Sequence, residues 1–301
     1  MMKKLAIIIP ILIVIFVIGI SIIGMFDLKQ KETEKEEAKP VLQDNVRLSV
    51  EQTKSNRTRI QLNITSIFNI YGFEYDYEIR NGEKIWQNAE FVIKPENVNL
   101  YEEIGVYNDN QKSVVIFPIF TAAAYSEPGF YTHFRGECDE KCLTVELKDA
   151  YAPTFPVSGN GFQVFTSLGY ETISDIDVDQ NPSTLEQYDK VILLHNEYVT
   201  KRMFNAITNH PNVIYLYPNA MYAEVEFNEE ENTITLIRGH NYPETHIANG
   251  FDWQFDNSVL EYNTDCSEMG FDKIDNGWML NCYPETAIHK SKVLLKMIKD
   301  F

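Results

Sequence analysis

Residues 190–194, Lys190-Val191-Ile192-Leu193-Leu194, decide the class of the fold. Four consecutive apolar side chains favour a strand covered on both faces, because a half-exposed strand would alternate apolar with polar residues. Residues 113–117 form a second continuous run and residues 212–216 a third, with a helical pattern at 201–208 between the last two. Strands that alternate with helices predict an α/β domain built on a doubly wound, mostly parallel sheet, with 190–194 as a central strand.

The rest of the chain divides by pattern. We assign residues 112–301 to the α/β domain, which closes with an amphipathic helix at 287–298. Residues 45–111 alternate apolar and polar side chains and contain the tight-turn pair Asn81-Gly82, so a small antiparallel β unit is expected there. Residues 28–44, which begin LKQKETEKEEAKP, are charged and predict a solvated stalk.

The N-terminus carries a long apolar segment. Residues 5–25 contain no charge, and a helix of that length, at 1.5 Å per residue, crosses a hydrocarbon layer about 30 Å thick. We therefore predict a single transmembrane anchor at 1–27, with the membrane as its partner. A cleaved signal peptide is the alternative. Its apolar stretch is usually about 7–15 residues long and ends at a small-x-small site, which Ser21-Ile22-Ile23-Gly24 matches poorly.

Two features of the body of the chain favour export. Lysines flank the apolar segment on both sides, so the positive-inside rule does not decide its orientation. However, Asn56-Arg57-Thr58 and Asn63-Ile64-Thr65 are glycosylation sequons, and the number of cysteines is even. Together with the N-terminal segment they predict a single-pass glycoprotein of the cell membrane whose C-terminal domain is extracytoplasmic.

The four cysteines lie in two local pairs. In an oxidising compartment we expect the disulfides Cys138–Cys142 and Cys266–Cys282, whereas a zinc site would more usually show C-x2-C pairs.

Composition bounds the function. Apolar residues make up 44% of the chain and aromatic residues 13%, which is enough for a sizeable core. A net charge of −18 argues against a nucleic-acid partner and against docking on anionic lipid, since both need basic patches.

Polar side chains follow the buried strands. Tyr125 comes after the first run, His195 and Glu197 after the second, and Asn219 after the third. Because parallel strands end at one edge of a sheet, we expect these four residues in one cleft, where they can bind a metal ion or transfer protons. The alternative is structural: His195 would cap the next helix and Glu197 would lie in its first turn, where the helix dipole favours a carboxylate.

Other motifs carry less chemistry. We interpret Arg238-Gly239-His240 as a turn with a solvated histidine. The sequence contains no G-x-S-x-G elbow, no P-loop and no G-x-G-x-x-G, so the corresponding hydrolases, nucleotidases and dinucleotide enzymes are not indicated.

Three blocks of sequence carry a resemblance to a known family. They are Phe117-Pro118-Ile119-Phe120-Thr121-Ala122-Ala123-Ala124-Tyr125, then His195-Asn196-Glu197-Tyr198, then Pro218-Asn219-Ala220-Met221-Tyr222 with a hairpin that ends at Arg238-Gly239. In order and spacing they resemble the C-terminal domain of the large subunit of N,N-dimethylformamidase, which is similar to the class I glutamine amidotransferase fold. The resemblance covers about residues 112–240, and the whole chain also resembles membrane-anchored archaeal surface proteins.

The resemblance implies a ferric iron that is held by tyrosines and a glutamate and acts as a Lewis acid on an amide carbonyl. By this resemblance Glu197 would be the carboxylate ligand, His195 its neighbouring acid/base and Tyr125 a phenolate ligand. Independently of the resemblance, the amide of Asn219 is of a kind that can orient a carbonyl. Val199 replaces the aromatic residue that usually follows E-Y in the family.

Because a shared fold does not fix the function, two functions are expected. One is a metal-dependent hydrolase of small amides, and the alternative is a non-catalytic surface protein that binds a ligand or partner.

Overall fold

The computed structural model describes residues 58–301 except 87–88, 148–157, 254 and 256. The predicted anchor at 1–27, the predicted stalk at 28–44 and the sequon at Asn56 lie outside the described residues. Among the helices that are described, none has the length and apolar character needed to cross a membrane.

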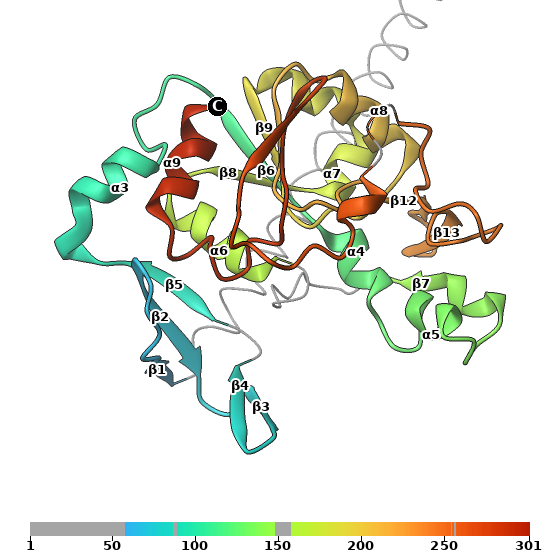
Figure 1. Cartoon of the computed structure of the whole chain (residues 1–301), viewed down its shortest axis with the longest axis horizontal. Helices are drawn as coiled ribbons and strands as arrows, with labels where there is room; N and C mark the ends of the chain where they lie inside the picture. The colour runs from blue at the N-terminus through green and yellow to red at the C-terminus, as the bar shows by residue number, and fades with distance from the viewer. Residues whose placement is uncertain (1–57, 87–88, 148–157, 254, 256) are drawn as a thin grey trace, which may run out of the picture. The chain divides into compact units, whose positions relative to one another are not determined.

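A six-stranded sheet forms the centre of the described chain (Figure 1). Its strands in spatial order are β14 (Phe271–Ile274), β15 (Gly277–Leu280), β11 (Val213–Tyr215), β9 (Lys190–Leu193), β6 (Ser113–Phe117) and β8 (Glu171–Ser174). All neighbours are parallel except the hairpin β14–β15. The predicted α/β class with a mostly parallel sheet is confirmed, and β9 is central as expected.

Across the sheet the five parallel strands lie in the order β8, β6, β9, β11, β15. Numbered by their order in the chain, this is 2-1-3-4-5, so the direction of winding reverses between β6 and β9. Ligands of open α/β sheets bind beyond the carboxyl ends of the strands at such a reversal. The segments that leave β6 and β9 are those that carry Tyr125, His195 and Glu197.

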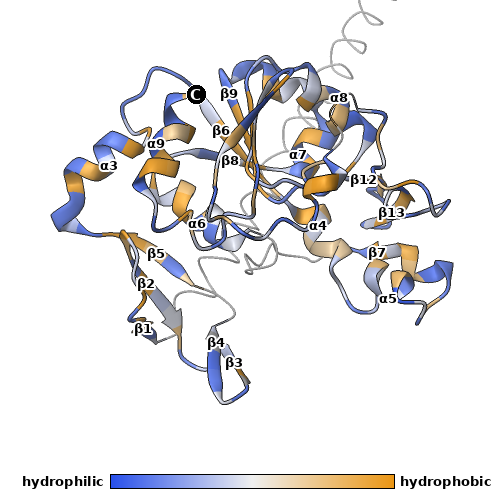
Figure 2. Ribbon diagram, in the orientation of Figure 1, coloured by the Kyte–Doolittle hydropathy of each residue, from blue (hydrophilic) through white to orange (hydrophobic). Residues whose placement is uncertain are grey.

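Helices cover both faces of this sheet, and β9 shows why its sequence is continuously apolar. Val191 and Leu193 pack into the core beneath α4 (Ile119–Ala124), α7 (Asp175–Gln180) and α8 (Lys201–Asn209). Ile192 and Leu194 pack on the other side, beneath α3 (Val98–Ile104), α6 (Gly159–Ser167) and α9 (Lys292–Asp300). Both α8 and α9 carry hydrophobic as well as hydrophilic residues, as amphipathic helices do (Figure 2).

The last helix begins later than predicted. The expected helix at 287–298 is α9 at Lys292–Asp300, because the Ser291 hydroxyl accepts a hydrogen bond from the Leu294 N–H and caps the helix there.

The region before β6 is antiparallel, as expected. One sheet contains β1 (Arg59–Gln61), β2 (Phe68–Phe73) and β5 (Glu90–Ile93), and the hairpin of β3 (Tyr77–Arg80) and β4 (Glu83–Trp86) turns at Asn81-Gly82. Asn81 and Gly82 both have positive φ, which two-residue hairpin turns require. This region belongs to the same compact unit as the parallel sheet, residues 57–301.

A separate four-stranded sheet contains β10 (Tyr198–Val199), β12 (Ala223–Asn228), β13 (Thr233–Arg238) and β7 (Thr144–Glu146). From the sequence, residues 224–227 and 233–237 are also expected to form a hairpin added at an edge of the parallel sheet; the hairpin is present as β12 and β13, but it lies in this separate sheet. The reason is that Tyr198 and Val199 leave the direction of β9 and pair with Ala223 and Glu224 of β12.

Both predicted disulfides, Cys138–Cys142 and Cys266–Cys282, are present, and no cysteine among the described residues is free. They are compatible with an extracellular protein.

Candidate functional site

The site begins where the chain leaves β9. The hydroxyl oxygen of Thr121, on α4, accepts hydrogen bonds from the backbone N–H groups of Glu197, at 3.0 Å, and Tyr198, at 3.2 Å. Helix α8 starts only at Lys201, and Thr200 is its N-cap. The structural alternative for His195 and Glu197, as a helix cap and a first-turn acid, is therefore wrong.

Glu197 is the centre of the site, and its side chain is 1% exposed. The Tyr125 hydroxyl donates to its Oε2 at 2.6 Å. Its Oε1 lies 2.6 Å from Nε2 of His240 and 3.4 Å from the Tyr131 hydroxyl. Both carboxylate oxygens thus have polar partners, as a buried carboxylate requires.

His195 lies beside this carboxylate. Its Nε2 is 3.5 Å from Oε2 of Glu197 and 3.4 Å from the Tyr125 hydroxyl. Nδ2 of Asn219 lies 3.0 Å from the same Nε2. With the amide of Asn219 as donor, Nε2 is the unprotonated nitrogen that accepts this hydrogen bond. The structure thus brings Tyr125, His195, Glu197 and Asn219 together.

His240 was not expected here, and its interpretation as a solvated histidine is wrong. Its side chain is 8% exposed. Gly239, His240 and Asn241 all have positive φ, so the chain that leaves β13 folds back and directs the imidazole at Glu197. The glycine before the histidine and the asparagine after it are the local signal for such a turn.

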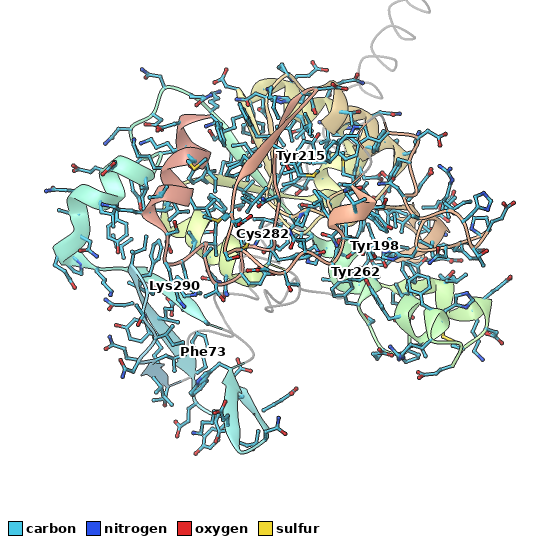
Figure 3. The ribbon with its side chains drawn as sticks, viewed as in Figure 1. Phe73, Tyr198, Tyr215, Tyr262, Cys282 and Lys290 are labelled. Carbon is cyan, nitrogen blue, oxygen red and sulfur yellow. A yellow bond between two sulfur atoms is a disulfide. The ribbon has the colours of Figure 1, made fainter. Side chains whose placement is uncertain are left out.

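Glu261 and Tyr131 were also missed. Glu261 follows a short 3-10 helix (Ser258–Leu260), and its Oε1 lies 3.3 Å from Nδ1 of His240. Figure 3 shows the neighbouring Tyr262 and, on β10, Tyr198. Neither Glu261 nor Tyr131 belongs to a recognisable motif, so no sequence pattern singled them out.

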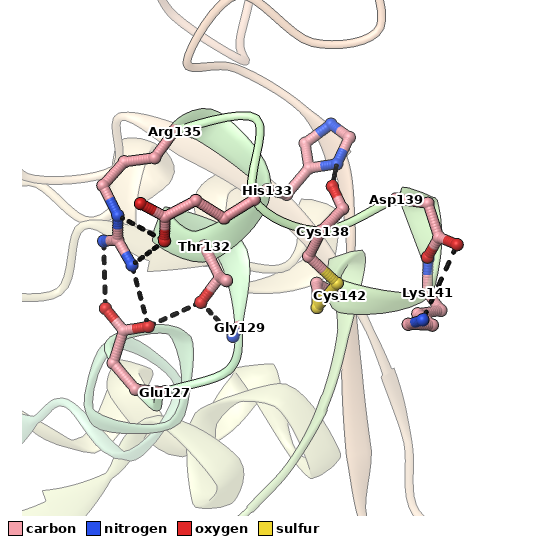
Figure 4. Close-up of a disulfide and its surroundings, with 10 residues drawn as sticks. Glu127, Gly129, Thr132, His133, Arg135, Cys138, Asp139, Lys141 and Cys142 are labelled. Carbon is pink, nitrogen blue, oxygen red and sulfur yellow. Dashed lines mark hydrogen bonds and ion pairs between the residues drawn. A yellow bond between two sulfur atoms is a disulfide. The ribbon is translucent and has the colours of Figure 1, made fainter.

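Tyr131 is presented by α5 (Phe130–Phe134), a short helix that is fastened on both sides (Figure 4). Arg135, which follows it, forms an ion pair with Glu127 at 3.0 Å. The disulfide Cys138–Cys142 closes the next loop. These links add to the packing of Phe130, which is fully buried in the core, and hold the segment that presents Tyr131.

The electrostatics of the site favour a negative Glu197 and a positive His240. Burial acts to raise the pKa of Glu197, but the hydrogen bond and charge of His240, with His195 and Tyr125, outweigh it and lower the pKa. Burial acts to lower the pKa of His240, and Glu197 and then Glu261 outweigh it and raise the pKa. Burial, then Glu197, raises the pKa of Tyr125 and of Tyr131, so both phenols stay protonated.

A second buried acid, Glu285, is linked to His195 through Tyr217. The imidazole stacks on the Tyr217 ring, with 4.7 Å between ring centroids, and the Tyr217 hydroxyl donates to Oε2 of Glu285 at 2.7 Å. Burial raises the pKa of Glu285 to about 8, although the bond from Tyr217 acts to lower it. Glu285 is therefore largely protonated at neutral pH.

Metal-binding groups converge at Glu197. One ligand atom each from Glu197, His240 and Glu261 lies within 4.8 Å of the others.

Comparison of the sequence with models of protein families finds no match, and a search of curated proteins likewise finds none.

Proposed function

We propose that this protein is a membrane-anchored, extracytoplasmic metalloenzyme that hydrolyses the C–N bond of small amides. The observation that carries the proposal is the contact between Tyr125 and Glu197, a phenol and a buried carboxylate 2.6 Å apart beyond the ends of two parallel strands. These are the two residue types that the resemblance to N,N-dimethylformamidase implies as iron ligands.

The residues present fit a hard cation such as ferric iron. Carboxylate and phenolate oxygens are hard ligands, and imidazole also suits iron. The pKa of Tyr125 is raised well above its usual value by burial and by Glu197, so a cation would have to displace the phenol proton for Tyr125 to act as a ligand. When bound, the ion would supply Lewis-acid polarisation of the amide carbonyl and a more acidic water.

The chain's own residues supply the remaining steps. The Asn219 amide, whose Nδ2 lies 3.0 Å from Nε2 of His195, can orient the substrate carbonyl. Nε2 of His195 can accept the proton that water loses as its oxygen bonds to the carbonyl carbon. The same nitrogen then donates that proton to the amine as the C–N bond breaks, so the histidine ends the cycle as it began.

The proposed location rests on separate features. The apolar segment at 5–25 supports attachment to the membrane, and the disulfides are compatible with an oxidising exterior. The membrane is then the partner at the N-terminus, and a small amide is the ligand of the site.

One observation favours the second candidate, a non-catalytic surface protein that binds a ligand. A cavity of about 330 Å³ lies away from Glu197, against β1, β2, the loop between them and Lys94. Its size lies within the range of small-molecule pockets.

The test uses the full chain, purified in detergent after expression with added iron. We expect iron close to one per chain by elemental analysis, hydrolysis of N,N-dimethylformamide or formamide, and loss of both in Glu197→Ala. A metal-free wild type that hydrolyses no simple amide contradicts the enzyme and leaves the binding protein as the better account.

A further inference from the structure

His240 brings a second carboxylate to the candidate metal site. Its two ring nitrogens face two different acids, with Nε2 at 2.6 Å from Oε1 of Glu197 and Nδ1 at 3.3 Å from Oε1 of Glu261. Both acids are nearly buried, since the side chains of Glu197 and Glu261 are 1% and 10% exposed. Three potential ligand atoms from three separate segments thus lie within 4.8 Å of one another.

The charges of this group do not balance. Two carboxylates face a single imidazole, and the rings that pack on this imidazole, Tyr198 and Tyr222, bring no positive charge. No lysine or arginine within the described ranges forms an ion pair with Glu197 or Glu261. A residual negative charge in a buried, aromatic setting is costly unless a cation neutralises it.

A buried polar atom of Asn219, which lies beside His195, has no partner among the described residues. Oδ1 of Asn219 is buried, and no hydrogen bond to it is found among the described residues, whereas Nδ2 of the same amide lies against His195. Asn219 as a whole is 3% exposed. Such an atom is normally satisfied by a ligand, an ion or a water molecule.

The surroundings hold His240 and Glu261 in place. The His240 ring stacks on Tyr198 and contacts the edge of Tyr222, with ring centroids 5.5 and 4.8 Å away. The Tyr283 hydroxyl donates to the backbone oxygen of Glu261. Fixed side chains of this kind are what a preorganised metal site needs.

We infer that His240 and Glu261 complete the coordination sphere begun by Glu197 and Tyr125, so that the metal is held by one imidazole nitrogen and three oxygens. This inference rests on the proposed function, but Glu261 lies outside the region of family resemblance and His240 at its boundary. One nitrogen with three hard oxygens favours ferric iron or a borderline divalent ion such as zinc over soft ions such as Cu(I).

The test is metal binding by the full chain in detergent, with ferric iron and with zinc added alone and bound metal measured by elemental analysis after dialysis. We expect His240→Gln and Glu261→Gln each to weaken binding by at least about tenfold, the loss that follows even from removing a supporting residue. Glu261→Asp, which keeps a carboxylate, should lose less. The matched controls are His246→Gln and Glu244→Gln, an exposed histidine–glutamate pair 3.4 Å apart, and should bind as the wild type does.

A spectroscopic measurement covers the case in which a variant folds poorly. Pulsed electron paramagnetic resonance of the iron-loaded wild type should detect a coordinated imidazole nitrogen, and the signal should persist in His195→Gln. A wild type without that signal overturns the inference. The inference is also overturned if His240→Gln and Glu261→Gln bind metal as tightly as the wild type does. If in that case Glu197→Gln still loses the metal, only the inference fails and the proposed function stands. A wild type that binds neither ion overturns both.

Discussion

The hydroxyl of Tyr125 and Oε2 of Glu197 lie 2.6 Å apart although 72 positions separate them in the sequence. Two features of the fold produce this contact. The strands β6 and β9 are parallel neighbours, so the segments that follow them leave the sheet at the same edge. Thr121 then fixes the backbone of Glu197 from the helix that leads to Tyr125. The site therefore depends on contacts between segments as well as on the motif H-x-E.

The first prediction concerns the buried charge of Glu197. Glu197→Ala removes the carboxylate that His240 contacts at 2.6 Å and leaves the buried imidazolium with only the longer contact to Glu261, at 3.3 Å. We expect the free energy of unfolding to fall by about 3–5 kcal/mol in metal-free protein, the usual cost of breaking a buried pair. Urea unfolding measures it. Glu244→Ala, which breaks the exposed pair with His246, should change stability by less than about 1 kcal/mol. Equal effects in the two variants contradict the prediction.

The second prediction concerns the anchor of the Glu197 backbone. Thr121→Val keeps the shape of the side chain but removes the oxygen that accepts from the buried N–H groups of Glu197 and Tyr198. Each N–H left without a partner costs about 1–3 kcal/mol, so unfolding should require clearly less urea. Thr121→Ser keeps the acceptor and should recover most of the loss. If serine is no better than valine, the hydrogen bonds are not what stabilises this turn.

The extent to which the site could be predicted follows from where each residue lies. Tyr125, His195, Glu197 and Asn219 all follow continuous apolar runs, and parallel pairing of those runs is enough to bring them together. His240 and Glu261 come from the segments after β13, where no periodic pattern exists, and 43 positions separate His240 from Glu197. Only the glycine and asparagine around His240 signal its turn. The pairing of β10 with β12 was missed because a two-residue strand carries too little pattern.

The third prediction compares the disulfides. The loop closed by Cys138–Cys142 spans 4 residues and that closed by Cys266–Cys282 spans 16. In the chain-entropy description their removal costs about 2 and about 3 kcal/mol respectively. We therefore expect the pair of alanine substitutions at 266 and 282 to lower the thermal midpoint more than the pair at 138 and 142. The reverse order would indicate that Cys138–Cys142 acts chiefly by holding α5 and Tyr131 in the native state.

The last prediction concerns pH and Glu285. Its pKa is raised from 4.5 to about 8 by burial, so the folded chain holds this proton between those pH values and the unfolded chain does not. The stabilisation is therefore fully present below about pH 4.5 and is lost as pH rises through about 8, with a slope of at most about 1.4 kcal/mol per pH unit. Glu285→Gln keeps a neutral acceptor for the Tyr217 hydroxyl and should remove this contribution. Urea unfolding of both proteins from pH 5 to pH 9 measures the difference, with Glu244→Gln as a control that keeps the wild-type slope. Parallel pH profiles for wild type and Glu285→Gln would show that Glu285 ionises normally in the folded protein.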